Sequence, residues 1–224
     1  MPPIIVSVQG NIGSGKSTLL DKLKTRMGNT VYNKDCNKLS VCFLKEPVDT
    51  WNTIVDENAT PILTLYYADQ QKYAFTFQMM AYISRLALIK KAIKDGFDII
   101  ISERSLATDK NVFAKMLYDD KKINYVEYSI YLKWFDEFQS EFPQENIIYV
   151  KTSPTIANQR VLERARDGEI IPIEYLENCH KYHEDWLKHT NKEKVITLDG
   201  NINTKLNPNV IDNWVSDIFE FLKI

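Results

Sequence analysis

Residues 4–18, IIVSVQGNIGSGKST, contain the pattern that indicates the fold of this chain most clearly. Residues 4–8 form a largely apolar, β-branched run, which is typical of a strand buried on both faces of a sheet. Residues 10–17 match the pattern G-x-x-x-x-G-K-[ST] in full, and a helix is expected over 17–27, closed by Gly28. A strand, a glycine-rich loop and a helix in this order predict a loop that binds the phosphates of a nucleotide.

The chemistry of this loop explains the prediction. Glycine lets the backbone curl so that its N–H groups point inward around an anion, and the helix N-terminus adds partial positive charge. Lys16 is expected to reach the terminal phosphates, and Ser17 to ligate Mg²⁺. The expected nucleotide-binding residues of the loop are Gly10, Asn11, Ile12, Gly13, Ser14, Gly15, Lys16, Ser17 and Thr18. The predicted cofactors are ATP, or another nucleoside triphosphate, and Mg²⁺.

The rest of the chain alternates between strand and helix patterns. Further strands are predicted over 41–44, 98–102, 147–150 and 195–198. Helices are predicted over 61–94, 105–118, 124–140 and 208–223, and two more are expected to begin at Pro154 and after Pro172. This alternation predicts an α/β fold with a five-stranded parallel sheet and helices on both faces. In such a sheet the site lies outside the carboxyl ends of the strands.

Length and composition suggest one globular unit. The chain has 224 residues, of which 44% are hydrophobic and 26% charged, with a formal net charge of −2, so we expect a single domain over residues 1–224. This charge provides no general attraction to nucleic acid or membranes, and neither is an expected partner. No targeting sequence or membrane-spanning run is visible, and the three cysteines form no CxxC pair, so a cytoplasmic location is expected.

Two acids and an arginine follow the ends of predicted strands. Glu46 comes shortly after the second strand and precedes Pro47, and Glu103 and Arg104 follow the third strand. Because these strand ends meet beside the glycine-rich loop, the three side chains are expected to converge there. Glu46 can accept a proton from an attacking hydroxyl, Arg104 can hold the incoming oxygen, and Glu103 can hold the water shell of a metal. The plain alternative for Glu46 is a solvated acid in a loop.

Six segments occur in an order that resembles the deoxynucleoside kinase family. They are GNIGSGKST (10–18), EPVDTW (46–51), AFTFQMMAYISR (74–85), ERSLATDKNVF (103–113), RVLERAR (160–166) and IPIEYLENCHKYHEDWL (171–187). The resemblance covers about residues 4–200, and several of its motifs are specific to the family. It implies the P-loop kinase fold and transfer of the γ-phosphoryl group of a nucleoside triphosphate to the 5′-hydroxyl of a deoxynucleoside, for nucleotide salvage.

The resemblance also implies catalytic and metal-binding roles. Glu46 resembles the base that takes the 5′-hydroxyl proton, and Arg104 resembles the residue that steadies that oxygen, so these two are the expected catalytic residues. Ser17 and Glu103 resemble the Mg²⁺-binding pair.

The nucleoside slot is expected from the same resemblance. Its expected substrate-binding residues are Glu46, Trp51, Leu63, Tyr67, Phe77, Gln78, Ala81, Arg85, Arg104, Asp109, Phe113 and Glu169. Trp51, Phe77 and Phe113 resemble aromatic walls for the base, and the amide of Gln78 resembles the group that reads the base edge. Tyr67 and Glu169 resemble the pair that contacts the sugar 3′-hydroxyl.

Three arginines follow the fourth predicted strand. Arg160 and Arg164 are four residues apart and share one helix face, and Arg166 adjoins Asp167-Gly168, an expected loop. Spacing alone is also compatible with a solvated basic face. The resemblance favours an arginine-rich lid over about residues 160–171 that closes over the transferring phosphate.

The choice of base depends on Ala81, Arg85 and Asp109. An arginine and an aspartate at these positions resemble the deoxycytidine and deoxyguanosine kinase branch, and such a pair can hydrogen-bond an amino or keto edge. The alternative is a purely structural salt bridge. We expect phosphorylation of deoxycytidine and purine deoxynucleosides, with thymidine a poor substrate.

Two other functions compete with this interpretation. A nucleoside monophosphate kinase of the thymidylate type would share the loop and lid, and a structural homologue with this fold would have no activity. The resemblance further implies a homodimer and feedback inhibition by a deoxynucleoside triphosphate.

Overall fold

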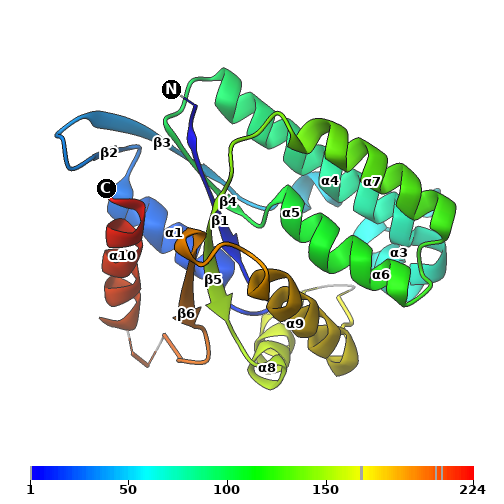
Figure 1. The fold of residues 1–224 in the computed structure, drawn as a ribbon. Helices are drawn as coiled ribbons and strands as arrows, with labels where there is room; N and C mark the ends of the chain where they lie inside the picture. The colour runs from blue at the N-terminus through cyan, green and yellow to red at the C-terminus, as the bar shows by residue number, and fades with distance from the viewer. Residues whose placement is uncertain (1, 167–168, 205, 208) are drawn as a thin grey trace.

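The computed structural model describes residues 2–166, 169–204, 206–207 and 209–224. Its centre is a six-stranded sheet with the order β2-β3-β4-β1-β5-β6 (Figure 1). The strands are β1 (Ile4–Gln9), β2 (Thr30–Tyr32), β3 (Lys38–Leu44), β4 (Ile99–Glu103), β5 (Asn146–Lys151) and β6 (Val195–Asp199). The predicted α/β class is confirmed, and all five predicted strands are present within these bounds or within one residue of them.

The prediction of five parallel strands is wrong in one respect. A sixth strand, β2, pairs antiparallel with β3, with Thr30 opposite Ser40, so the sheet is mixed. The other pairings, β3 with β4, β4 with β1, β1 with β5 and β5 with β6, are parallel. The β2 strand has three residues, of which only Val31 is buried, and so short an edge strand leaves no hydrophobic period in the sequence.

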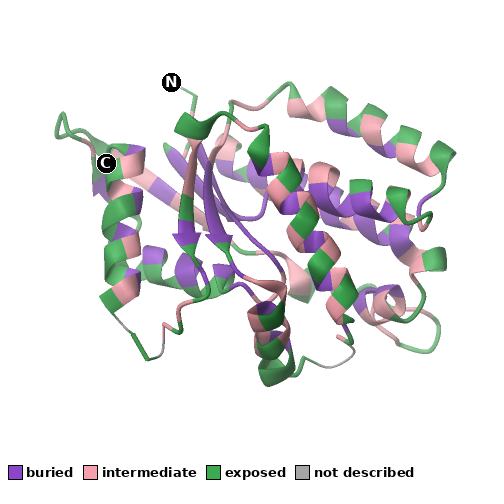
Figure 2. Cartoon of the chain, turned by 60° about the horizontal axis from the view of Figure 1, so that its bottom comes forward, coloured by how far each residue is buried: buried purple, intermediate pink, exposed green. Residues whose placement is uncertain are grey.

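Alternate residues of the central strands face two separate helix layers. On one face, Val6 and Val8 pack with α1 (Lys16–Met27) and α10 (Asn209–Leu222). On the other, Ile5 packs with α4 (Gln70–Lys94) and α7 (Tyr125–Gln139). The central strands are therefore buried on both sides, as Figure 2 shows in purple.

Two long predicted helices are interrupted. The helix predicted over 61–94 divides into α3 (Ile62–Ala68) and α4, because the Asp69 carboxylate accepts a hydrogen bond from the backbone N–H of Lys72 and caps a new helix. The segment predicted over 105–118 contains α5 (Leu106–Thr108), the π-helical η1 (Asp109–Ala114) and α6 (Lys115–Asp119). Such π-helical turns are frequent at functional sites. The remaining helices are α2 (Val48–Trp51), α8 (Pro154–Arg164), α9 (Ile173–Lys188) and the 3₁₀ turn η2 (Lys192–Lys194).

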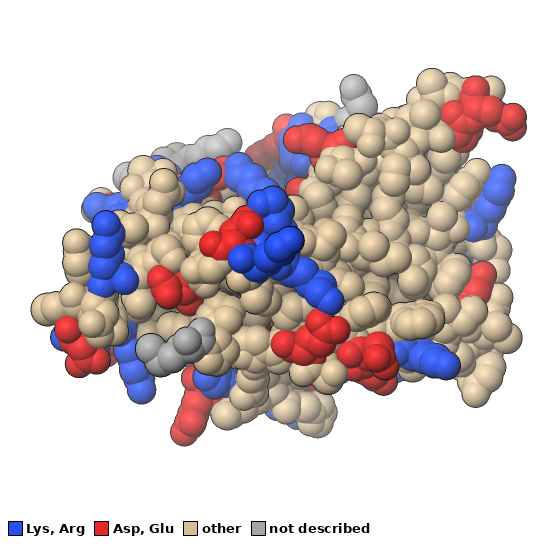
Figure 3. Space-filling view, turned by 90° about the horizontal axis from the view of Figure 1, so that it is seen from above, with Lys and Arg blue, Asp and Glu red and all other residues tan. Residues whose placement is uncertain are grey.

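The face of the molecule shown in Figure 3 carries both basic and acidic side chains. Basic side chains gather near its middle, and acidic side chains lie beside them. Over the residues that the structure describes, no helix has the length and apolar character required to cross a membrane.

Candidate active site

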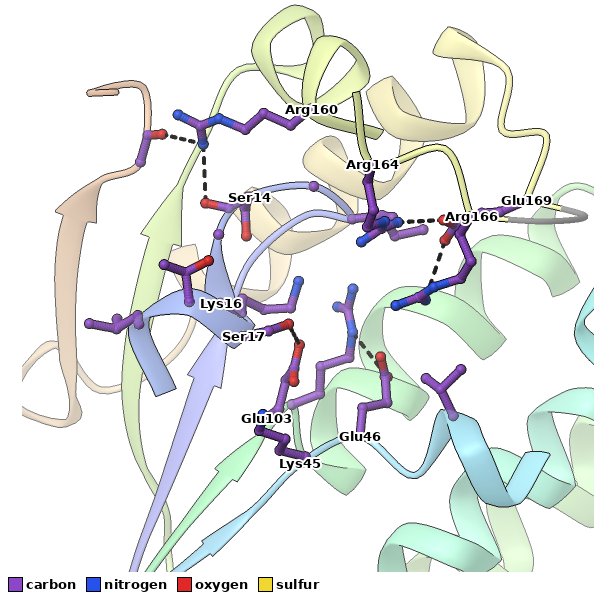
Figure 4. Close-up of a pocket in the computed structure, with 18 of the residues that line it drawn as sticks. Ser14, Lys16, Ser17, Lys45, Glu46, Glu103, Arg160, Arg164, Arg166 and Glu169 are labelled. Atoms are coloured by element: carbon purple, nitrogen blue, oxygen red, sulfur yellow. Dashed lines mark hydrogen bonds and ion pairs between the residues drawn. The ribbon is translucent and has the colours of Figure 1, made fainter. Parts of the chain in front are cut away.

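A cavity of about 660 Å³ opens at the carboxyl ends of β1, β3 and β4. Every site residue predicted from the sequence lines it except Gly10 and Asn11. This volume suits a small-molecule ligand. Figure 4 shows Lys16, Ser17, Glu46 and Glu103 around the lower half of the opening, with Arg164, Arg166 and Glu169 above.

The glycine-rich loop between β1 and α1 depends on backbone shapes that glycine alone adopts easily. Gly13 has φ of 78°, and a Cβ atom there would lie 2.4 Å from the carbonyl oxygen of Ala157. The side chain of Asn11 fastens the loop by donating to the carbonyl of Leu176 at 2.8 Å. Lys16 donates to the carbonyl of Asn11 at 2.7 Å. Burial, together with the nearby charge of Arg104, lowers the pKa of Lys16 to about 7.

Glu46 is held between two arginines. Its Oε1 lies 3.0 Å from Arg85 Nη2 and 3.3 Å from Arg104 Nε. Burial alone would raise the pKa of Glu46, but the positive charges of Arg104, Arg85 and Lys16 outweigh that effect and hold the pKa below its usual value. Glu46 is therefore ionised at neutral pH and is available to accept a proton.

Arg104 has a backbone conformation that is unusual for a residue other than glycine. Its φ is 63°, and its guanidinium donates to the carbonyl of Gly10 at 3.0 Å while lying 4.7 Å from the centre of the Phe113 ring. Residues in such backbone conformations cluster at active sites, where the surroundings fix them.

Ser17 and Glu103 form an oxygen pair at the mouth of the loop. The Ser17 hydroxyl donates to Glu103 Oε1 at 2.7 Å (Figure 4). A hydroxyl and a carboxylate suit Mg²⁺, which commonly takes one or two protein oxygens and completes its shell with water and substrate phosphates. Among the described residues there is no cluster of three or more histidine, cysteine or acidic side chains that would hold a metal on its own.

The inner end of the cavity is aromatic. Trp51 meets Phe77 edge to face, with ring centres 5.4 Å apart, and both rings are buried. Gln78 is 2% exposed, and its Oε1 has no hydrogen-bond partner among the described residues. A buried acceptor without a partner costs free energy, so this atom suits a ligand N–H group.

Arg85 and Asp109 form the ion pair that the sequence suggested. Arg85 Nε lies 2.9 Å from Asp109 Oδ2, and Arg85 Nη1 donates to the backbone carbonyl of Glu103 at 2.7 Å. Arg85 also contacts Glu46, so its guanidinium links the carboxylates of Asp109 and Glu46.

The three predicted lid arginines differ in their contacts. Arg164 and Arg166 both pair with the buried carboxylate of Glu169, at 2.6 and 3.8 Å. Arg160 donates instead to backbone carbonyls, including that of Gly200 at 2.8 Å. The predicted loop at Asp167-Gly168 lies outside the described residues.

Sequence reasoning missed several residues that line the cavity. They are Leu19, Lys45, Val48, Asp49, Tyr66, Glu163, Tyr175, Gly200, Ile202, Asn203, Thr204, Ile211 and Trp214. Lys45 and Tyr66 adjoin predicted residues and could have been suspected on that ground. Tyr175 lies on α9 within the quoted segment 171–187, but nothing in that segment singles it out, and Trp214 lies on α10 outside every quoted segment; tertiary packing brings both to the cavity.

A glycine-rich loop with a buried lysine, beside carboxylates and arginines at the ends of parallel strands, is typical of enzymes that transfer phosphoryl groups. The sequence comparisons narrow this class. The family model described as deoxynucleoside kinase matches residues 6–223. A probable deoxycytidine kinase of fowlpox virus (strain NVSL) is 33% identical over 97% of this chain and 87% of its own length.

Two human proteins are also similar. Deoxycytidine kinase of Homo sapiens is 32% identical over 97% of this chain and 90% of its own length. Mitochondrial thymidine kinase 2 of Homo sapiens is 31% identical over 82% of this chain and 64% of its own length. The chain belongs to the deoxynucleoside kinase family, as its motifs predicted, and it is an enzyme that phosphorylates deoxynucleosides.

Proposed function

We propose that this chain, as one kinase domain over residues 1–224, transfers the γ-phosphoryl group of ATP or another nucleoside triphosphate to the 5′-hydroxyl of a deoxynucleoside, for nucleotide salvage. The observation that carries the proposal is that Lys16 and Glu46 line the same cavity, with Arg104 between the glycine-rich loop and the Glu46 carboxylate. A phosphate donor and a hydroxyl acceptor can therefore meet in one space.

On the donor side, the glycine-rich loop from Gly10 to Thr18 would serve as the P-loop. Its backbone N–H groups and the Lys16 ammonium would hold the phosphates. Ser17 and Glu103 would hold Mg²⁺, which neutralises phosphate charge when it is bound.

The arginines above the opening would complete the donor side. We propose that residues 160–171 form a lid, in which Arg164 and Arg166 exchange their pairing with the Glu169 carboxylate for contacts to the phosphates. Positive charge placed there would stabilise the charge that develops on the transferring phosphoryl group.

On the acceptor side, Glu46 would take the proton from the 5′-hydroxyl and Arg104 would steady its oxygen. The low pKa of Glu46 keeps it ionised at neutral pH, and a positioned base of this kind accelerates a reaction by about 10²–10⁴-fold. Trp51, Phe77 and Phe113 would enclose the base, and Tyr67 and Glu169 would contact the sugar.

Three side chains would select the base. The unpartnered Oε1 of Gln78 suits an N–H donor on the base edge, and the Arg85–Asp109 pair offers charge-assisted hydrogen bonds beside it. We infer a preference for deoxycytidine and purine deoxynucleosides over thymidine.

We also propose a homodimer through the outer face of α7 and α4. Val126, Ile130 and Trp134 are spaced four residues apart on α7 and are exposed, and Ile83 on α4 is 53% exposed. An exposed apolar stripe of this kind is typical of a protein interface.

Feedback inhibition by a deoxynucleoside triphosphate would follow from the shape of the cavity. Because one cavity contains both the aromatic end and the glycine-rich loop, such a nucleotide could place its base at one and its phosphates at the other. It is expected to compete with both substrates.

The main rival is a nucleoside monophosphate kinase of the thymidylate type. Turnover with deoxycytidine as acceptor, compared with deoxycytidine monophosphate, separates the two functions. We expect phosphorylation of the nucleoside, whereas phosphorylation of the monophosphate alone would overturn the proposal.

A further inference from the structure

Gln9 is a buried amide between the glycine-rich loop and the turn that contains Arg104. It is the last residue of β1, directly before the glycine-rich loop, and it is 0% exposed. The neighbouring strand β4, which lies beside β1 in Figure 1, ends at Glu103 and is followed directly by Arg104. The proposed reaction gives Gln9 no role, since its side chain does not line the cavity.

Both ends of the Gln9 amide are used. Its Nε2 donates to the Ser105 hydroxyl at 2.9 Å, and its Oε1 accepts from the Thr108 hydroxyl. Ser105 also donates to Glu145 Oε1 at 3.0 Å and caps α5. Because an amide has both a donor and an acceptor, it fits between these two hydroxyls, and an apolar side chain of similar size would lose both contacts.

The same short segments are also joined through Arg104. Its backbone N–H donates to the carbonyl of Val8 at 3.0 Å, and its side chain donates to the carbonyl of Gly10 at 3.0 Å. Gln9 lies between these two acceptors, and its partner Ser105 directly follows Arg104. The positive φ of Arg104 is unfavourable for a residue with a side chain, so this conformation persists only while its surroundings hold it.

We propose that Gln9 is a positioning residue that keeps the Arg104 turn in register with the glycine-rich loop. Its hydrogen bonds to Ser105 and Thr108 hold the backbone that follows Arg104, so that the Arg104 guanidinium stays between Gly10 and Glu46. The inference rests on the proposed roles of Arg104 and Glu46, and it adds a residue that acts through them without touching either substrate.

Gln9→Met and Thr108→Val test the inference in the full-length enzyme. Each variant removes the Gln9–Thr108 hydrogen bond, and each is expected to lower kcat by about tenfold or more, because small displacements of catalytic groups are costly. Because both variants break the hydrogen bond between Gln9 and Thr108, their effects are not expected to add, and the double variant should be little slower than the slower single variant. Thr190→Val is the matched control: it removes a threonine hydroxyl that donates to Trp186 on α9, away from the cavity, and kcat should be unchanged.

The pH profile distinguishes positioning from a loss of stability. Glu46 faces Arg104, Arg85 and Lys16, and a displaced Arg104 would withdraw the first of these charges. The acid limb of kcat/KM is therefore expected to move to higher pH in Gln9→Met and Thr108→Val, at a temperature where circular dichroism shows both to be folded. If Gln9→Met does not fold, Thr108→Val alone decides.

Two results would contradict different parts of this proposal. A folded Thr108→Val or Gln9→Met variant with kcat and pH profile equal to those of the wild type would overturn the role of Gln9 alone. Full turnover in Glu46→Gln would instead overturn the proposed base, and with it the premise of this inference.

Discussion

The guanidinium of Arg104 lies 3.3 Å from the carboxylate of Glu46, although the two residues follow different strands. The same guanidinium donates to the carbonyl of Gly10 at the start of the glycine-rich loop. The expected donor and acceptor sides of the reaction are thus joined by one side chain.

Glu46→Gln should leave nucleotide binding intact and lower kcat by about 10²-fold or more, because the amide cannot accept the 5′-hydroxyl proton as a carboxylate does. Steady-state kinetics and equilibrium titration with ATP measure the two effects. Glu141→Gln is a suitable control, since this exposed acid pairs with Lys90 and does not line the cavity. Unchanged turnover in Glu46→Gln would remove this residue from the mechanism.

Gly13→Ala should weaken ATP binding by about tenfold or more. The added Cβ atom would lie 2.4 Å from the backbone oxygen of Ala157 at a φ of 78°, so the loop must shift. Gly96→Ala provides the comparison, because Gly96 has φ of 80° but none of the described residues places an atom within 4 Å of the added Cβ. Equal ATP affinity in the two variants would show that contact with α8 does not shape the loop.

His183 should make the folded protein sensitive to acid. Burial lowers the pKa of His183 to about 3, from 6.5 in the unfolded chain, so between these values the unfolded state binds more protons. The free energy of unfolding therefore falls by about 1.4 kcal/mol per pH unit from this group as the pH drops below 6.5.

Urea unfolding at pH 7 and pH 5 tests this for His183→Gln, whose side chain does not titrate in this range. The wild type should lose about 2 kcal/mol more than the variant between these pH values. The exposed His189→Gln variant should behave as the wild type. Identical pH dependence in wild type and His183→Gln would contradict the argument.

Trp134→Glu should convert a dimer to a monomer. Trp134 is 46% exposed on the apolar stripe of α7, and a carboxylate buried there without a partner would be costly. Sedimentation velocity measures the change, and Tyr32→Glu, at an exposed aromatic residue on β2, is the control. A monomeric wild type would refute the proposed interface.

Much of the fold and site could be predicted because local patterns encode them. The run from Ile4 to Thr18 specifies strand, loop and helix, and Glu46, Glu103 and Arg104 follow strand ends. The β2 strand could not be predicted, because three residues with one buried side chain show no period. The break at Asp69 was missed because apolar residues keep helical spacing on both sides of a capping residue.

The side chains contributed by distant helices were also beyond prediction. Tyr175 and Trp214 reach the cavity only through the packing of α9 and α10. Arg160 shares a helix face with Arg164, yet its guanidinium binds backbone carbonyls near Gly200, which spacing could not reveal.

Product analysis with MgATP and an equimolar mixture of the four deoxynucleosides tests the proposed reaction most directly. Mass spectrometry and NMR would identify which nucleoside is phosphorylated and at which oxygen. We expect 5′-monophosphates of deoxycytidine and the purine deoxynucleosides, with little thymidine monophosphate. Formation of no 5′-monophosphate would contradict the kinase mechanism, and thymidine as the best substrate would contradict the role of Arg85 and Asp109 in selecting the base.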